Sequence, residues 1–100
     1  MPELKDLIIE VVKVEGSCAA GYKVGDKIYI SGANVDLQKS TKVCYWALSS
    51  IMPLIFSMQS GIEPSEFGFS DEKGVAYIAC SDIGKPYTRG GRVIFKVIRA

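Results

Sequence analysis

The feature that most constrains the fold of this chain is a run of twenty residues without a formal charge, residues 43–62. A helix of that length is able to span a bilayer. Polar and helix-breaking residues interrupt the run, however, at Ser49, Ser50, Pro53, Ser57, Gln59, Ser60 and Gly61. The rest of the chain has the pattern of strands that need a helix to cover them. We therefore expect a buried core helix and no membrane span.

Apolar residues recur at helical spacing within this run, which predicts one helix that is apolar on most sides. Ser40 or Thr41 is the expected N-cap, because a hydroxyl there can accept a backbone N–H bond from the first turn. Pro53 removes one backbone hydrogen bond and should kink the helix near the carbonyl of Ser49. Gly61 suits the C-terminal cap. The prediction is one long, kinked apolar helix.

Four apolar, β-branched segments flank the helix and predict strands. They are residues 7–14, 27–30, 75–80 and 92–98, and residues 33–39 are expected to be irregular. The order along the chain is then β-β-α-β-β, which predicts an α+β fold in which one helix covers a small antiparallel sheet. One hundred residues correspond to one domain, so residues 1–100 are taken as a single α+β domain.

Histidine is absent, which removes imidazole as a general base, a metal ligand or a pH switch. The three cysteines are an odd number and do not form a closed disulfide framework. No secretory signal is visible, because the opening segment lacks a basic region and Glu10 interrupts its apolar run. We therefore expect a cytoplasmic protein with free thiols.

Cys18, Cys44 and Cys80 form the candidate site. Cys18 lies just past the first predicted strand, Cys44 in the first turn of the helix, and Cys80 at the end of the third strand. The ends of such elements can meet on one side of a sheet, where three thiols would form a cluster. With Thr41 as the N-cap, Cys44 is the third helical residue, where free backbone N–H groups favour a thiolate.

Three interpretations of these cysteines stay open: a redox-active thiol, a metal site, or packing as small hydrophobes in the core. There is no Cys-x-x-Cys pair, and a closed zinc or iron–sulfur site normally has four ligands. The fourth ligand of a thiolate-bound metal would have to be Asp26, Asp82, water or a group from a partner. Asp26 and Asp82 are also the candidate polar neighbours of a thiol site without metal.

Four short motifs are spread over nearly the whole length of the chain. Gly-x-Cys-x-x-Gly-x-x-x-Gly-Asp spans residues 16–26, Cys-x-x-Ala spans 44–47, Cys-x-Asp spans 80–82, and residues 93–99 approximate Val-x-Phe-x-Ile-x-Arg, with Val97 in the isoleucine position. Together they resemble a small uncharacterised prokaryotic family. The resemblance implies that the three cysteines belong to one shared pattern, and it implies no particular activity. Tyr22 stands where that family often has histidine, and Pro64-Ser65 where it has a Pro-Trp pair.

Charge is unevenly distributed. Residues 1–82 carry seven basic and eleven acidic groups, whereas residues 83–100 carry five basic groups and no acid. A basic strand can contact phosphates, but no aromatic-rich nucleic-acid motif accompanies it, so we expect no nucleic-acid partner. Its arginines are instead expected to pair with acids such as Glu10 or Glu15.

The predicted helix is apolar nearly all round, whereas a sheet covers only one of its faces. A second copy of the chain would cover the rest, which predicts a homodimer through the helix. Two functional hypotheses follow. The first is a small soluble domain with a thiol-centred redox or metal site, and the alternative is a non-enzymatic homo-oligomeric binding or assembly module whose cysteines are structural.

Overall fold

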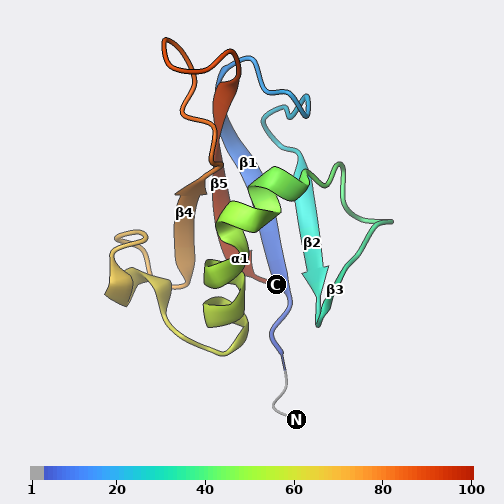
Figure 1. The fold of residues 1–100 in the computed structure, drawn as a ribbon. Coiled ribbons are helices and arrows are strands. Elements are labelled where there is room, and N and C mark those ends of the chain that lie inside the picture. Colours follow the sequence, from blue (N-terminus) through green and yellow to red (C-terminus); the bar gives the residue numbers. More distant parts are fainter. Residues whose placement is uncertain (1–3) are drawn as a thin grey trace.

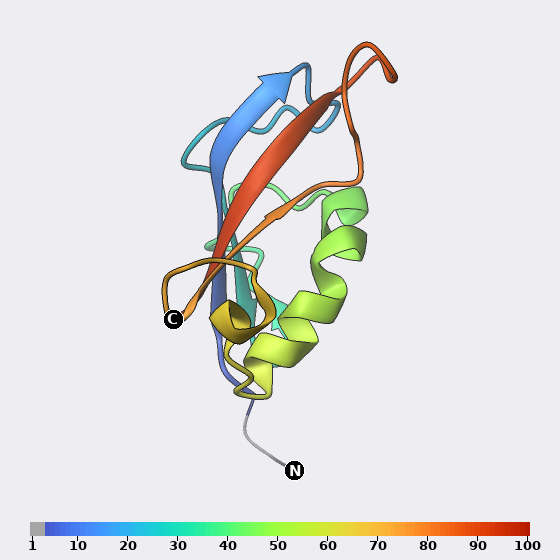
Figure 2. The ribbon, with the colours of Figure 1, turned by 90° about the vertical axis from the view of Figure 1, so that its left-hand side faces the viewer.

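Five antiparallel strands form one sheet in the computed structural model, which describes residues 4–100 (Figure 1). The strands lie in the order β3-β2-β1-β5-β4. Their bounds are Leu7–Gly16 for β1, Lys27–Ser31 for β2, Asn34–Val35 for β3, Val75–Ala79 for β4 and Gly91–Arg99 for β5. One helix, α1 (Tyr45–Gln59), packs on one face of this sheet, as both ribbon views show (Figures 1 and 2). The α+β class predicted from the sequence is confirmed.

The two long central strands, β1 and β5, supply most of the sheet's contribution to the core. Alternate residues of each strand point to the same face, so every second side chain is buried under the helix. These are Leu7, Ile9 and Val11 in β1 and Val93, Phe95 and Val97 in β5. The pairing register shifts between Val11 and Lys13, which marks a β-bulge.

Helix α1 contributes the opposite wall of the core through Ala47, Ile51, Leu54, Ile55 and Met58. It is a single helix of 15 residues that contains Pro53. The long, kinked helix predicted from the sequence is therefore wrong. Among residues 4–100, no helix has both the length and the apolar character needed to cross a membrane.

The helix is shorter than predicted because the expected capping residues serve β2 instead. The Ser40 hydroxyl accepts the N–H of Tyr29 at 2.9 Å, and the Thr41 hydroxyl accepts the N–H of Lys27 at 3.2 Å. The N–H of Thr41 also donates to the Lys27 carbonyl at 2.8 Å. The segment before the helix thus continues strand-like pairing along β2, and Cys44 becomes the N-cap.

Strand β3 lies inside the segment predicted to be irregular, so the order along the chain is β-β-β-α-β-β and not β-β-α-β-β. Its two residues pair with β2, Asn34 opposite Ser31 and Val35 opposite Ile30. The tight turn between β2 and β3 depends on Gly32, whose φ of 56° lies in the left-handed region.

The C-terminal end of α1 is tied to the sheet by Arg99 of β5. Its Nε donates to the Met58 carbonyl at 3.0 Å, and its NH2 group donates to the Ile62 carbonyl at 2.6 Å. Gly61 follows the C-cap with a φ of 92°, the conformation that ends many helices. A short 3-10 helix, η1 (Pro64–Phe67), then leads toward β4.

Candidate thiol site

Cys18, Cys44 and Cys80 line one small pocket at the end of the sheet where β1 and β4 finish. Cys18 lies in the β1–β2 connection, Cys44 caps α1, and Cys80 directly follows β4; each is half-buried. We call this cavity the thiol pocket. Its other lining residues are Ala19, Ala20, Tyr22, Trp46, Ala47, Ser81, Asp82, Gly91, Val93 and Phe95.

The strand order explains why the three cysteines line the same pocket. Strands β1 and β4 are both antiparallel to β5, which lies between them, so they run in the same direction and finish at the same end of the sheet. Helix α1 begins over that end. The pocket has a volume of about 30 Å³, which is room for about two water molecules.

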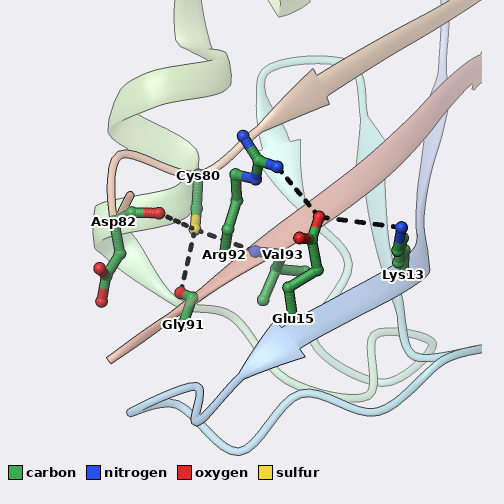
Figure 3. A network of polar contacts seen from close by, with 7 residues as sticks. All are labelled: Lys13, Glu15, Cys80, Asp82, Gly91, Arg92 and Val93. Carbon is green, nitrogen blue, oxygen red and sulfur yellow. Dashed lines mark hydrogen bonds and ion pairs between the residues drawn. The ribbon is translucent and has the colours of Figure 1, made fainter. Parts of the chain in front are cut away.

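The sulfur of Cys80 is held by backbone groups of its own sheet and loop (Figure 3). The N–H of Val93 donates to Cys80 Sγ at 3.3 Å, and the carbonyl oxygens of Asp82 and Gly91 each lie 3.9 Å from that sulfur. The N–H of Cys80 itself donates to the Val93 carbonyl at 3.0 Å. Cys80 is therefore fixed between β4 and β5 by contacts on both its backbone and its sulfur.

Cys44 is the N-cap of α1 and not the third helical residue that the sequence predicted. Its carbonyl accepts the N–H of Leu48 at 3.0 Å, the first bond of the helix. Its side chain makes no capping hydrogen bond. The thiol thus lies at the N-terminal end of α1, beside the first-turn backbone N–H groups that have no partner within the helix.

Cys18 is positioned by a turn that is anchored to the segment before α1. The N–H of Gly21 donates to the Cys18 carbonyl at 3.0 Å. Lys42 Nζ donates to the Gly21 carbonyl at 3.0 Å and to the Ala20 carbonyl at 3.5 Å. The lysine therefore joins the connection that carries Cys18 to the residues that precede Cys44.

Tyr22 is a pocket residue that the sequence reasoning did not select. Its side chain is 5% exposed, and its ring meets Phe95 edge-on, with 5.6 Å between centroids. Its hydroxyl donates to the Lys42 carbonyl at 3.1 Å and accepts the N–H of Cys44 at 2.9 Å. The one signal in the sequence was a bulky aromatic residue within a glycine-rich turn. A turn that packs against the core needs such a side chain, whereas a solvent-exposed turn does not.

Burial is the main reason that the pKa of Tyr22 is raised above its ordinary value. The hydrogen bond from the Cys44 N–H opposes that effect, while the nearby Cys44, Cys18 and Asp26 side chains raise the pKa further. The hydroxyl is therefore protonated at neutral pH and donates its proton to the Lys42 carbonyl.

The two predicted carboxylate neighbours have other roles. Asp82 lines the pocket, but its carboxylate accepts the N–H of Gly84 at 2.9 Å and the hydroxyl of Thr88. These bonds, the Thr88 hydroxyl first, lower the pKa of Asp82. Asp26 lies in the turn before β2, where its carboxylate accepts the N–H of Lys23 at 2.9 Å. Both carboxylates thus stabilise their own loops.

Within residues 4–100, no group of three or more cysteine, aspartate or glutamate side chains is arranged to hold a metal ion. The metal interpretation of Cys18, Cys44 and Cys80 gains no support from this arrangement. The convergence of the thiols instead leaves thiol chemistry and packing as the two interpretations that the geometry accommodates.

Two of the five basic groups near the C-terminus are engaged within the molecule. Arg92 NH2 lies 3.1 Å from Glu15 Oε1, which is the pairing expected from the sequence, and Lys13 Nζ lies 4.0 Å from the same oxygen (Figure 3). Arg99 is bound to carbonyls at the end of α1. This part of the surface therefore offers less free positive charge than the sequence indicated.

Comparison of the chain with protein-family models, with curated proteins and with solved structures finds no match. The resemblance to a small prokaryotic family stays a prediction from the motifs.

Proposed function

We propose that the chain is a thiol-redox domain in which Cys18 and Cys44 form the reactive pair and Cys80 is a structural thiol. The observation that carries this proposal is that three cysteines from three separate elements line a single pocket. Packing alone does not call for that arrangement, because any small apolar residue fills a core position as well as cysteine does.

The different contacts of the three sulfurs support the division of roles. Cys80 Sγ already accepts a backbone N–H and faces two backbone carbonyls. Cys44 carries a thiol that is not used in capping its helix. Cys18 lies on a connection joined to the Cys44 segment through Lys42 and Tyr22. The pair with the fewest competing contacts is therefore Cys18 and Cys44.

The proposed reaction is thiol–disulfide exchange with a low-molecular-weight disulfide. The Cys44 thiolate attacks one sulfur of the oxidant, forms a mixed disulfide and releases one thiolate. The Cys18 thiolate then attacks the Cys44 sulfur, closes the Cys18–Cys44 disulfide and releases the second thiolate. The protein loses two electrons and two thiol protons, and the oxidant is reduced to two thiols.

Oxidation by glutathione disulfide, followed by mass spectrometry and peptide mapping, tests this proposal. We expect the native protein to lose two thiols and about 2 Da as one intramolecular disulfide closes, with Cys80 still reduced. Cys18→Ser and Cys44→Ser should each stop at a mixed disulfide or stay reduced, whereas the matched control Cys80→Ser should still close the disulfide. Three thiols that stay reduced in the wild type, or a disulfide that includes Cys80, would overturn the assignment.

A second candidate function, the homo-oligomeric assembly module, is favoured by the outer face of α1. The helix contains no charged residue, and its exposed side chains include Tyr45, Trp46 and Phe56. Grooves of about 250 and 220 Å³ flank it, and neither is lined by a charged residue. A surface without charge does not repel its own copy across a twofold axis, so a second copy of the chain is the partner we infer.

Light scattering at increasing protein concentration tests this second candidate. We expect a dimer that Phe56→Glu converts to a monomer, because a carboxylate would then be buried in the interface. Val24→Glu is the matched control, since Val24 is comparably exposed but lies in the turn before β2 and lines neither groove. A wild-type monomer at high concentration, or equal effects of the two variants, would rule out this interface.

A further inference from the structure

We infer that Tyr22 is a positioning residue for the Cys18–Cys44 pair: its hydroxyl sets the separation of the two thiols and so the ease with which they form a disulfide. This inference rests on the thiol-redox function proposed above. It assigns a chemical role to a side chain that makes no covalent change itself.

The hydroxyl bridges two backbone groups on either side of Val43. It donates its proton to the Lys42 carbonyl at 3.1 Å and accepts the N–H of Cys44 at 2.9 Å. In many helices the N-cap N–H is satisfied by a glutamate or glutamine side chain three residues further on. Here the Cys44 N–H is instead bound by the hydroxyl of Tyr22, more than twenty residues earlier in the chain. The start of α1 is therefore attached to the β1–β2 connection.

The same connection carries Cys18, four residues before Tyr22. The turn between them is closed by the bond from the Gly21 N–H to the Cys18 carbonyl at 3.0 Å. The ring of Tyr22 is held in the core against Phe95. The tyrosine is therefore a rigid link between the two segments that bear the reactive thiols.

The Cys44 thiol takes no part in capping the helix. An N-cap side chain usually accepts an N–H bond from the first turn, and the side chain of Cys44 does not. The backbone at the helix start is held by the Tyr22 hydroxyl, which donates to the Lys42 carbonyl and accepts the Cys44 N–H. Pre-organised geometry of this kind raises the rate and the equilibrium constant of a reaction between two groups in the same molecule.

The test is the equilibrium of the Cys18–Cys44 pair with reduced and oxidised glutathione, expressed as an effective concentration of the two thiols. Tyr22→Phe keeps the ring in the core and removes only the hydroxyl. We expect the effective concentration to fall about tenfold, the size of effect that two lost hydrogen bonds of ordinary strength can produce. The alkylation rate of Cys80, whose sulfur is held by backbone groups of Asp82, Gly91 and Val93, should stay unchanged.

Two control variants separate positioning from general stability. Tyr77→Phe removes a hydroxyl from a partly exposed tyrosine on β4 and should change neither quantity. Val75→Ala shortens a buried side chain away from the pocket and should lower the melting temperature without changing the effective concentration.

The outcomes distinguish the two proposals. If the wild type forms no Cys18–Cys44 disulfide, the proposed function fails and Tyr22 has nothing to position. If the wild type forms that disulfide and Tyr22→Phe has the same effective concentration, the thiol-redox function stands and the role of Tyr22 is overturned. An equal fall in Tyr22→Phe and Val75→Ala would likewise overturn it, because the effect would then follow stability alone.

Discussion

Replacing Gly91 by alanine tests the close approach of β1 and β5 beside the thiol pocket. A Cβ at this position would lie 2.6 Å from the backbone nitrogen of Ser17 and 2.7 Å from the carbonyl carbon of Gly16, and it would also meet the Glu15 carbonyl oxygen. All three atoms belong to the backbone, so no side-chain rotation relieves the contact. The two strands must separate at the end where they support Cys18 and Cys80.

Overpacking a closely packed interior typically costs about 1–3 kcal/mol, and we expect about 3 kcal/mol here because only backbone can move. For a domain of this size each kcal/mol lowers the melting temperature by about 4–8 °C. The matched control is Gly74→Ala. Gly74 has a φ of 80°, and no atom lies within 4 Å of the place that an added methyl group would take. That variant therefore measures left-handed backbone strain alone, about 1–2 kcal/mol.

Thermal and urea unfolding followed by circular dichroism give the two free energies of unfolding. Alkylation of the native protein then reports on the pocket. Gly91→Ala should speed the alkylation of Cys80, because the sulfur lies 3.9 Å from the Gly91 carbonyl, whereas Gly74→Ala should not. A smaller loss of stability in Gly91→Ala than in Gly74→Ala would refute the close approach of the two strands.

Three further predictions concern polar contacts outside the reactive pair. Hydrogen bonds from backbone N–H groups, that of Gly74 first, lower the pKa of Glu63 to about 2. The ionised Glu63 carboxylate therefore stabilises the fold fully above the ordinary pKa near 4.5, and this stabilisation is lost as the pH falls toward 2. Glu63→Gln should flatten the dependence of melting temperature on pH in that interval. The pKa of Asp82 is lowered chiefly by the Thr88 hydroxyl, so Asp82→Asn should loosen the loop before β5 and speed its limited proteolysis, and identical cleavage rates would contradict this. Arg99→Ala should cost about 1–2 kcal/mol in urea unfolding by freeing carbonyls at the end of α1, with the half-buried Lys96→Ala on the same strand as the control.

Local patterns in the sequence were enough to predict the types of the main elements. Alternating apolar residues predicted β1, β2, β4 and β5 to within two residues at each end, because burial of one face of a sheet imposes a period of two. The uncharged run predicted the position of helix α1, though not its length, for a similar reason, since its apolar residues repeat with the period of a helix. The chain cannot bury its apolar surface without satisfying these patterns.

The start of the helix depends on tertiary contacts. Ser40 and Thr41 carry the side chains of good N-caps, and the sequence gives no sign that β2 competes for them. In the folded chain their hydroxyls bind backbone N–H groups of β2, so the helix begins after Cys44. Strand β3 was not predicted because it has two residues, and an alternation of apolar and polar residues cannot be recognised over so short a segment.

The candidate site likewise depends partly on local sequence pattern and partly on tertiary contacts. The sequence pattern placed Cys18, Cys44 and Cys80 at the ends of elements. That they line one pocket depends on the strand order, in which β5 separates two strands that run in the same direction. Strand order depends on pairing between residues far apart in the chain, which local pattern does not encode. Tyr22 enters the pocket for the same reason: its hydroxyl partners, Lys42 and Cys44, are about twenty residues away in sequence and within 3.1 Å in space.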